Sequence, residues 1–149
     1  MLIFISFLIL TLLGLLAYVR LAPSDPAVWH GDPADRFDFA AAPVGQVIAL
    51  QGGAALRIAA AEPEEALTQL DAIALATPRT QRLAGSAAEG RITWVTRSNL
   101  WGFPDYTTAV ARTDQVDVYA RLRFGKSDLG VNAARLTDWA ARLAALPPS

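Results

Sequence analysis

The chain has 149 residues, 53% of them hydrophobic, and a formal net charge of −1, which fits one domain with an additional apolar segment. A net charge this close to zero argues against a chain that binds nucleic acid through its overall charge. The absence of cysteine excludes disulfides, a thiol nucleophile and a lipid anchor on cysteine.

Residues 1–22 are predicted to form a transmembrane anchor. The run from Met1 to Val19 carries no charged residue, and Arg20 follows it. At about 1.5 Å per residue, a helix of this length nearly spans a bilayer core of about 30 Å. The run lacks the basic start, the shorter apolar core and the small-residue cleavage site of a signal peptide. We therefore predict an uncleaved, single-pass anchor, although Arg20 alone favours a cytoplasmic domain.

Residues 23–43 are predicted to be a linker or an arm that lies over the domain, because they are rich in proline and lack periodicity. Trp29 is interpreted as an aromatic anchor next to the membrane. The only histidine is His30, and a metal site shared with Asp32 is the less favoured interpretation. No metal or cofactor is predicted.

Residues 44–149 are predicted to form one domain in the order helix, four strands, helix. The first helix is expected over Glu62–Ala76, and tight turns join the strands in two antiparallel hairpins. The four strands are expected at Gln81–Ser86, Arg91–Ser98, Tyr106–Arg112 and Val116–Phe124, with further short candidates at Val44–Leu50 and Leu56–Ala60.

The last helix shows apolar residues at the spacing i, i+3, i+4, i+7 from Leu136 to Leu143 and is expected to end at Pro147-Pro148. Together these elements predict a two-layer α+β domain, with an antiparallel sheet of about four strands and both helices on one face. The predicted core consists of Ile92, Trp94, Leu122, Phe124, Leu136, Trp139 and Leu143.

The turn between the last strand and the last helix holds most of the distinctive polar residues. Its Gly125-Lys126-Ser127 is not a nucleotide-binding phosphate loop, because that motif needs a glycine where Ala120 stands. The helix start nevertheless offers free N–H groups to an anion, or to Asp128 as a cap.

This block resembles the signature of a bacterial and plastid family known as domain of unknown function 1499, which implies no established activity. Leu122, Tyr119 and Tyr106 depart from the residues common in that family. The resemblance implies an envelope protein, so the predicted location is the inner membrane with a periplasmic domain. The matching residues are Arg123, Gly125, Ser127, Asp128, Leu129, Gly130, Asn132 and Arg135, with similar segments at 96–98 and 102–105.

The last three strands, taken as a meander, bring the motif residues to one edge of the sheet. Arg121 and Arg123 would then point away from the helices onto an open sheet face, where arginine forks suit carboxylate and phosphate oxygens. Asp105 and Asp128 are expected to be ionised partners of Arg97 and Arg123. The predicted ligand-binding residues are Arg97, Asp105, Arg121, Arg123, Lys126, Ser127, Asp128, Asn132 and Arg135.

Three functional hypotheses remain open. The first is a non-enzymatic, membrane-tethered envelope domain that binds an anionic group or an envelope protein at this edge. The second is an enzyme acting on a phosphate or carboxylate ester with Asp128 or Ser127, and the third is a structural module. The lack of a usable histidine, cysteine or carboxylate pair favours the first and third, so no catalytic residue and no nucleic-acid partner is predicted. The loop aromatics Trp101, Phe103 and Tyr106 are expected to fold back onto the core rather than to contact a ligand.

Overall fold

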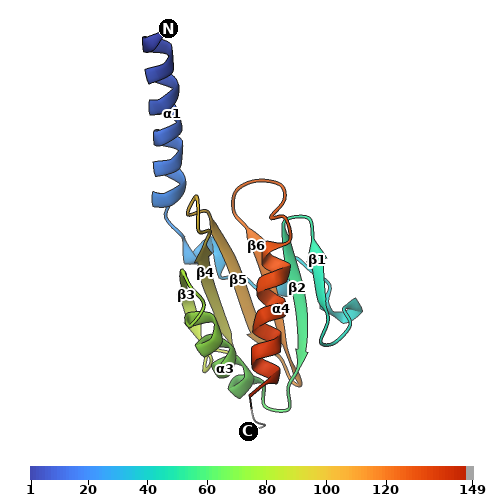
Figure 1. Ribbon diagram of the computed structural model, residues 1–149. Coiled ribbons are helices and arrows are strands. Elements are labelled where there is room, and N and C mark those ends of the chain that lie inside the picture. Colours follow the sequence, from blue (N-terminus) through green and yellow to red (C-terminus); the bar gives the residue numbers. More distant parts are fainter. Residues whose placement is uncertain (147–149) are drawn as a thin grey trace.

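The computed structural model describes residues 1–146, which form an apolar helix, an arm and a two-layer α+β domain (Figure 1). Helix α1 (Leu2–Leu21) leads into the arm, which contains α2 (Pro26–Trp29), η1 (Pro33–Asp35) and η2 (Phe39–Ala41). The domain consists of β1 (Val47–Leu50), β2 (Gly53–Ala59), α3 (Pro63–Leu75), β3 (Thr80–Ser86), β4 (Arg91–Arg97), β5 (Pro104–Ala111), β6 (Gln115–Leu122) and α4 (Val131–Ala144).

The sheet has six strands in the order β1-β2-β6-β5-β4-β3, and every neighbouring pair is antiparallel. The prediction of about four strands was wrong, because β1 and β2 form a hairpin that adds to the free edge of β6. At Gly53 a Cβ atom would lie 2.1 Å from the carbonyl oxygen of Ala120, so this close pairing requires glycine. Small residues such as Ala54 and Ala55 give little hydrophobic alternation, which is why the sequence pattern for β2 is weak.

Helices α3 and α4 both cover one face of the sheet, as predicted, and enclose the main core with it (Figure 1). Four predicted core residues are at most 1% exposed: Ile92, Trp94, Leu136 and Trp139. Leu143 packs at the rim of this core.

Leu122 and Phe124 differ from the prediction, because neither belongs to the buried core. Strand β6 ends at Leu122, and the side chain of Leu122 lies over Gly52 in the β1–β2 hairpin. Phe124 lies beyond the strand, where its ring packs against Tyr18 of α1 and Phe103. The alternation of a strand therefore could not be extended to residue 124.

Helix α4 ends at Ala144, and Ala145 closes it with backbone bonds to Ala141 and Leu143. The predicted stop at Pro147 and Pro148, like the last three residues of the predicted domain 44–149, lies outside the described residues.

The arm covers the opposite face of the sheet, so the prediction of an open, solvated face was wrong. His30 Nδ1 lies 2.8 Å from the hydroxyl of Thr93 on β4, and the arm residue Phe39 is buried. The indole of Trp29 stacks on Tyr106 of β5 and so packs on the sheet instead of serving as a free aromatic anchor. Residues of the arm thus contact the sheet directly, and the domain has polar and aromatic contacts on one face and an apolar core on the other.

Candidate functional site

Strands β4, β5 and β6 form the predicted meander, and their ends meet at one edge of the sheet. Arg97 pairs with Pro104 across β4 and β5, and Tyr106 pairs with Arg121 across β5 and β6. Successive residues of a strand point to opposite faces. The nine predicted site residues are consequently divided between the helix-covered face, the arm-covered face and the turn that joins β6 to α4.

Asp105, Asn132 and Arg135 form a network on the helix-covered face. The amide of Asn132 donates to the Asp105 carboxylate at 3.2 Å, and Arg135 donates to the Asn132 side-chain oxygen at 2.6 Å and to Asp105 at 3.5 Å. Burial raises the pKa of Asp105, opposed by the charge of Arg135, and burial lowers the pKa of Arg135. Asp105 was expected to pair with Arg97 or Arg123, but its partner is Arg135. The network ties the first turn of α4 to β5.

Asp128 and Ser127 organise the turn before α4. The two carboxylate oxygens of Asp128 accept from the backbone N–H groups of Gly130 at 3.1 Å and Asn132 at 2.9 Å. The Ser127 hydroxyl accepts from the N–H of Leu129 at 3.2 Å. The N-cap position itself is Gly130 and not Ser127 or Asp128 as predicted, but Asp128 accepts from a free N–H in the first turn of α4 and so does the work of a cap from two residues earlier. The expected ion pair of Asp128 with Arg97 or Arg123 does not occur within the part of the chain that the structure describes.

Arg121 and Arg123 lie on the arm-covered face and bind the arm. Arg123 donates to the carbonyl of Pro23 at 2.8 Å and to the hydroxyl of Tyr106 at 3.1 Å. The guanidinium of Arg121 lies 4.5 Å from the centre of the Trp29 ring. Burial lowers the pKa of Arg121, and the nearby charge of Arg36 adds to this effect. Arg123 is thus hydrogen-bonded within the protein, and Arg121 lies over an aromatic ring of the arm.

Arg97 instead lines a cavity of about 320 Å³ beside the end of α1, together with Arg20 and Arg79. Arg97 Nη1 donates to the carbonyl of Gly102 at 3.1 Å, and Arg79 Nε donates to the carbonyl of Arg97 at 3.1 Å. Gly102 has a φ of +71°, and a Cβ there would lie 2.7 Å from Arg20 Nε, so glycine lets Arg20 reach the cavity. The remaining lining residues are Gln81, Val95, Ser98, Asn99 and Gly102.

This arginine cavity, as we call it, contains no compensating acid. None of its lining residues is Asp or Glu, and across residues 1–146 no ion pair joins Arg20, Arg79 or Arg97 to a carboxylate. Sequence reasoning missed Arg79, which has a φ of +61° that no local pattern indicates. It also missed Arg20, which was interpreted only as a signal for membrane orientation.

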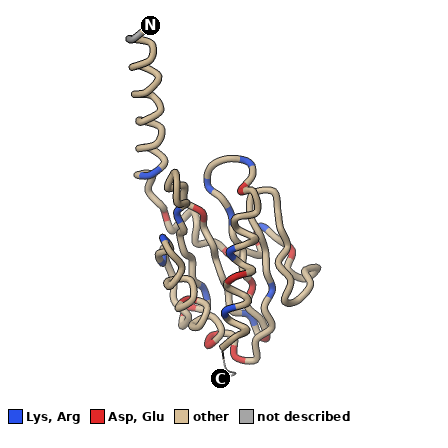
Figure 2. Tube along the Cα trace, in the orientation of Figure 1, with Lys and Arg blue, Asp and Glu red and all other residues tan. Residues whose placement is uncertain are grey.

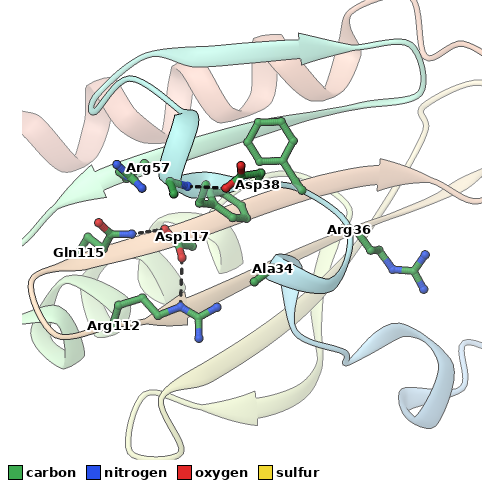
Figure 3. A pocket seen from close by; sticks show the side chains of 10 residues that line it. Ala34, Arg36, Asp38, Arg57, Arg112, Gln115 and Asp117 are labelled. Atoms are coloured by element: carbon green, nitrogen blue, oxygen red, sulfur yellow. Dashed lines mark hydrogen bonds and ion pairs between the residues drawn. The ribbon is translucent and has the colours of Figure 1, made fainter.

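A larger cavity, of about 680 Å³, lies between the arm, strands β2 and β6, and Arg112 in the turn that precedes β6 (Figure 3). Arg112 bonds to Asp117 at 3.0 Å and to Asp32, so its charge is compensated inside the protein. Figure 3 shows the side chains of Arg36 and Arg57 on opposite sides of this cavity, and they do not converge on one point. The larger cavity is thus a poorer anion site than the smaller one.

Lys126 and the three loop aromatics Trp101, Phe103 and Tyr106 differ in their exposure. Lys126 is exposed on the turn and does not line the arginine cavity. Tyr106 is 1% exposed and Phe103 packs on Phe124, as expected for aromatics folded onto the protein, whereas Trp101 is 46% exposed. No group of three His, Asp or Glu side chains suited to a metal ion occurs among residues 1–146.

The fold and site define a two-layer α+β domain, preceded by a helix whose length and apolar composition suit a membrane span, as those of a secretory signal sequence also do. Residues 34–143 match the model of the family described as "Protein of unknown function (DUF1499)", and the chain belongs to that family. The resemblance seen in the sequence is therefore confirmed, and the match begins within the arm. No curated protein and no solved structure matches the chain. The family description gives no activity.

Proposed function

We propose that this protein is a membrane-tethered, non-enzymatic envelope domain that binds an anionic group in the arginine cavity. The observation that carries the proposal is the convergence of Arg20, Arg79 and Arg97 on one cavity that has no acidic lining residue.

Three arginine side chains line this cavity and no Asp or Glu does, so an anion bound there would meet positive charge without a competing carboxylate in the lining. The guanidinium fork matches the oxygens of phosphate and carboxylate groups. One N–H of Arg97 and one of Arg79 bond to backbone carbonyls, which fixes these side chains while leaving further N–H groups free. A volume of about 320 Å³ is at the lower end of ligand cavities, about 300–1,000 Å³, and suits a small anionic group.

The residues around the cavity support binding rather than ester hydrolysis. Nucleophilic catalysis by a hydroxyl needs an adjacent base. The only hydroxyl that lines the cavity belongs to Ser98, which accepts a hydrogen bond from the N–H of Phe103 at 3.0 Å. The lining contains no His, Asp or Glu that could activate it. Ser127 and Asp128, the candidates for catalysis, are engaged by backbone N–H groups in the turn.

The tether in this proposal is α1, whose leucine and isoleucine side chains are almost all exposed in the protein alone. We place the domain on the periplasmic side because of the family resemblance, against the weak opposing signal of Arg20. Fusions of alkaline phosphatase and of green fluorescent protein to the C-terminus would test the side. Alkaline phosphatase activity without fluorescence is expected, and the reverse result would place the domain in the cytoplasm.

Phosphorus NMR titration of inorganic phosphate against the full chain in neutral detergent micelles tests the cavity. Arg97→Gln and Arg79→Gln should each weaken binding about tenfold or more, since a hydrogen bond to a charged group contributes about 1.5–3 kcal/mol. Arg36→Gln is the matched control, because it removes an exposed arginine that lines only the larger cavity. Absence of phosphate binding, or equal binding by all three variants, would overturn the proposal.

A further inference from the structure

Two loops lie at the end of the domain from which α1 leaves: residues 98–103, between β4 and β5, and residues 123–130, between β6 and α4 (Figure 1). Phe124 contacts Tyr18 of α1, with ring centroids 6.3 Å apart, and Phe103 of the other loop, at 6.2 Å. The last turn of α1 and the two loops therefore form one end of the molecule.

The tips of these loops expose apolar side chains. Leu129 is 92% exposed and Leu100 is 75% exposed, which makes them the most exposed large hydrophobic residues described after α1. Trp101, beside Leu100, is 46% exposed. Clustered exposed apolar residues indicate an interaction surface, whereas single ones do not.

Leu129 is also held in an unfavourable backbone conformation, with a φ of +53°. A non-glycine residue in this region costs free energy, on the order of 1–3 kcal/mol, and such strain is typical of functional sites. The hydroxyl of Ser127 accepts from the N–H of Leu129, and the carboxylate of Asp128 holds the residues that follow. The turn is thus fixed so that it presents a leucine to the surroundings.

The end of the domain that holds these two loops is connected to α1 by only a few residues. Ala22, directly after α1, is buried, and the Ser24 hydroxyl lies 2.7 Å from the hydroxyl of Tyr106 on the sheet. No flexible linker therefore separates the apolar helix from the domain. Arg20 belongs to the last turn of α1 and also lines the arginine cavity, so the cavity lies next to the end of the proposed span.

We infer that this end of the domain rests on the bilayer that α1 spans, with Leu100, Trp101 and Leu129 in the interfacial layer and a lipid-headgroup phosphate in the arginine cavity. This inference rests on the proposed function and names the source of its anion. Tryptophan is enriched at membrane interfaces, and basic residues are attracted to anionic lipid surfaces. Figure 2 shows basic residues where α1 joins the domain and on the loop that follows β6, which includes the exposed Lys126.

The absence of cysteine makes a site-specific test clean. Leu129→Cys and Val44→Cys would each carry an environment-sensitive fluorophore on the full chain in nanodiscs of phosphatidylcholine, with and without phosphatidylglycerol. Val44 is the matched control, because it is 53% exposed and bridges to Arg57, toward the end of the sheet away from α1.

The label at position 129 should emit at shorter wavelength and be quenched by lipids spin-labelled near the headgroup, whereas the label at 44 should do neither. Phosphatidylglycerol should enlarge the shift at position 129, and Arg97→Gln should abolish this enlargement. A label at 129 that behaves like the one at 44 in both lipids would overturn the contact with the bilayer. A shift that Arg97→Gln leaves unchanged in both lipids would overturn the headgroup assignment.

Failure of the proposed function has a different signature. In that case inorganic phosphate would not bind in micelles, or its binding would not depend on Arg97 and Arg79. Phosphate binding that depends on both arginines, together with a fully hydrated label at 129, would retain the anion cavity and refute the lipid source.

Discussion

The indole ring of Trp29 stacks on the phenol ring of Tyr106, with centroids 3.9 Å apart and planes inclined by 15°. Tyr106 is 1% exposed, and its hydroxyl contacts Ser24 and Arg123. This pair joins the arm to the centre of the sheet, and through Ser24 and Arg123 it also fixes the first residues after α1. The position of the arginine cavity relative to α1 therefore depends on the packing of the arm.

Trp29→Ala should lower the free energy of unfolding by about 2 kcal/mol. This is roughly half of the 3–5 kcal/mol for a fully buried tryptophan, because Trp29 is only half-buried. Chemical denaturation of the full chain in neutral detergent measures the change. Trp101→Ala serves as the control and should change stability by less than about 0.5 kcal/mol, since Trp101 lies exposed on a loop. Equal effects of the two substitutions would contradict the role of the stack.

Trp139→Ala should cost about 3–5 kcal/mol in the same experiment. Trp139 is 1% exposed, packs edge-on against Trp94 with centroids 5.6 Å apart, and donates its indole N–H to the hydroxyl of Thr77 at 2.9 Å. The substitution leaves a cavity between the sheet and the helices, although the Thr77 hydroxyl keeps its hydrogen bonds to the carbonyl of Ile73 and from Arg142. A loss below about 1 kcal/mol would be inconsistent with this packing.

Double-mutant cycles should show that Asp105 is energetically coupled to an arginine, whereas Asp128 is not. Asp128→Ala should cost about 1 kcal/mol as a lost cap. Its effect should add to that of Arg123→Ala within about 0.5 kcal/mol, because the two side chains bond to different groups. Asp105→Ala and Arg135→Ala should instead show a coupling of about 0.5–3 kcal/mol, because they form an ion pair. The reverse pattern would mean that Asp128, and not Asp105, is the ion-pair partner in the motif.

The arm should loosen in mild acid through His30. Burial lowers the pKa of His30 from its ordinary value of 6.5, the charge of Arg91 lowers it further, and Glu89 opposes both. Because the unfolded chain binds this proton more readily, stability is fully present above pH 6.5 and is lost as the pH falls through 6.5 toward the folded pKa. Unfolding measured at pH 7.5 and 5.5 should show this loss in the wild type and not in His30→Gln. An unchanged slope in the variant would assign the effect to other groups.

The full chain should fractionate with membranes, because the apolar side chains of α1 are exposed in the protein alone. A chain that begins at Pro23 should be soluble and folded, although it loses the contact of Tyr18 with Phe124. Membrane flotation and circular dichroism measure the two properties. Full-length protein with an intact N-terminus in the soluble fraction would refute the anchor.

The sequence alone was sufficient to predict the apolar helix, helices α3 and α4, strands β3 to β6 and the antiparallel meander. These features follow from periodicity and from short turns, which are local properties of the chain. It also indicated that the carboxylate of Asp128 accepts from a free N–H at the start of α4, although the N-cap position is Gly130. It did not place β1 and β2 in the sheet, because small residues such as Gly53 leave little hydrophobic alternation.

Tertiary structure alone decided what lies on each face of the strand edge. The arm covers the face that was expected to be open, and it contacts Arg121 and Arg123 there. On the other face, Asp105 forms an ion pair with Arg135. The arginine cavity combines residues 20, 79 and 97, which are distant in sequence and include one with a positive φ. Local patterns fix the faces of helices and strands, but the partners of each face are set by long-range packing, and the convergence of three arginines is a product of that packing.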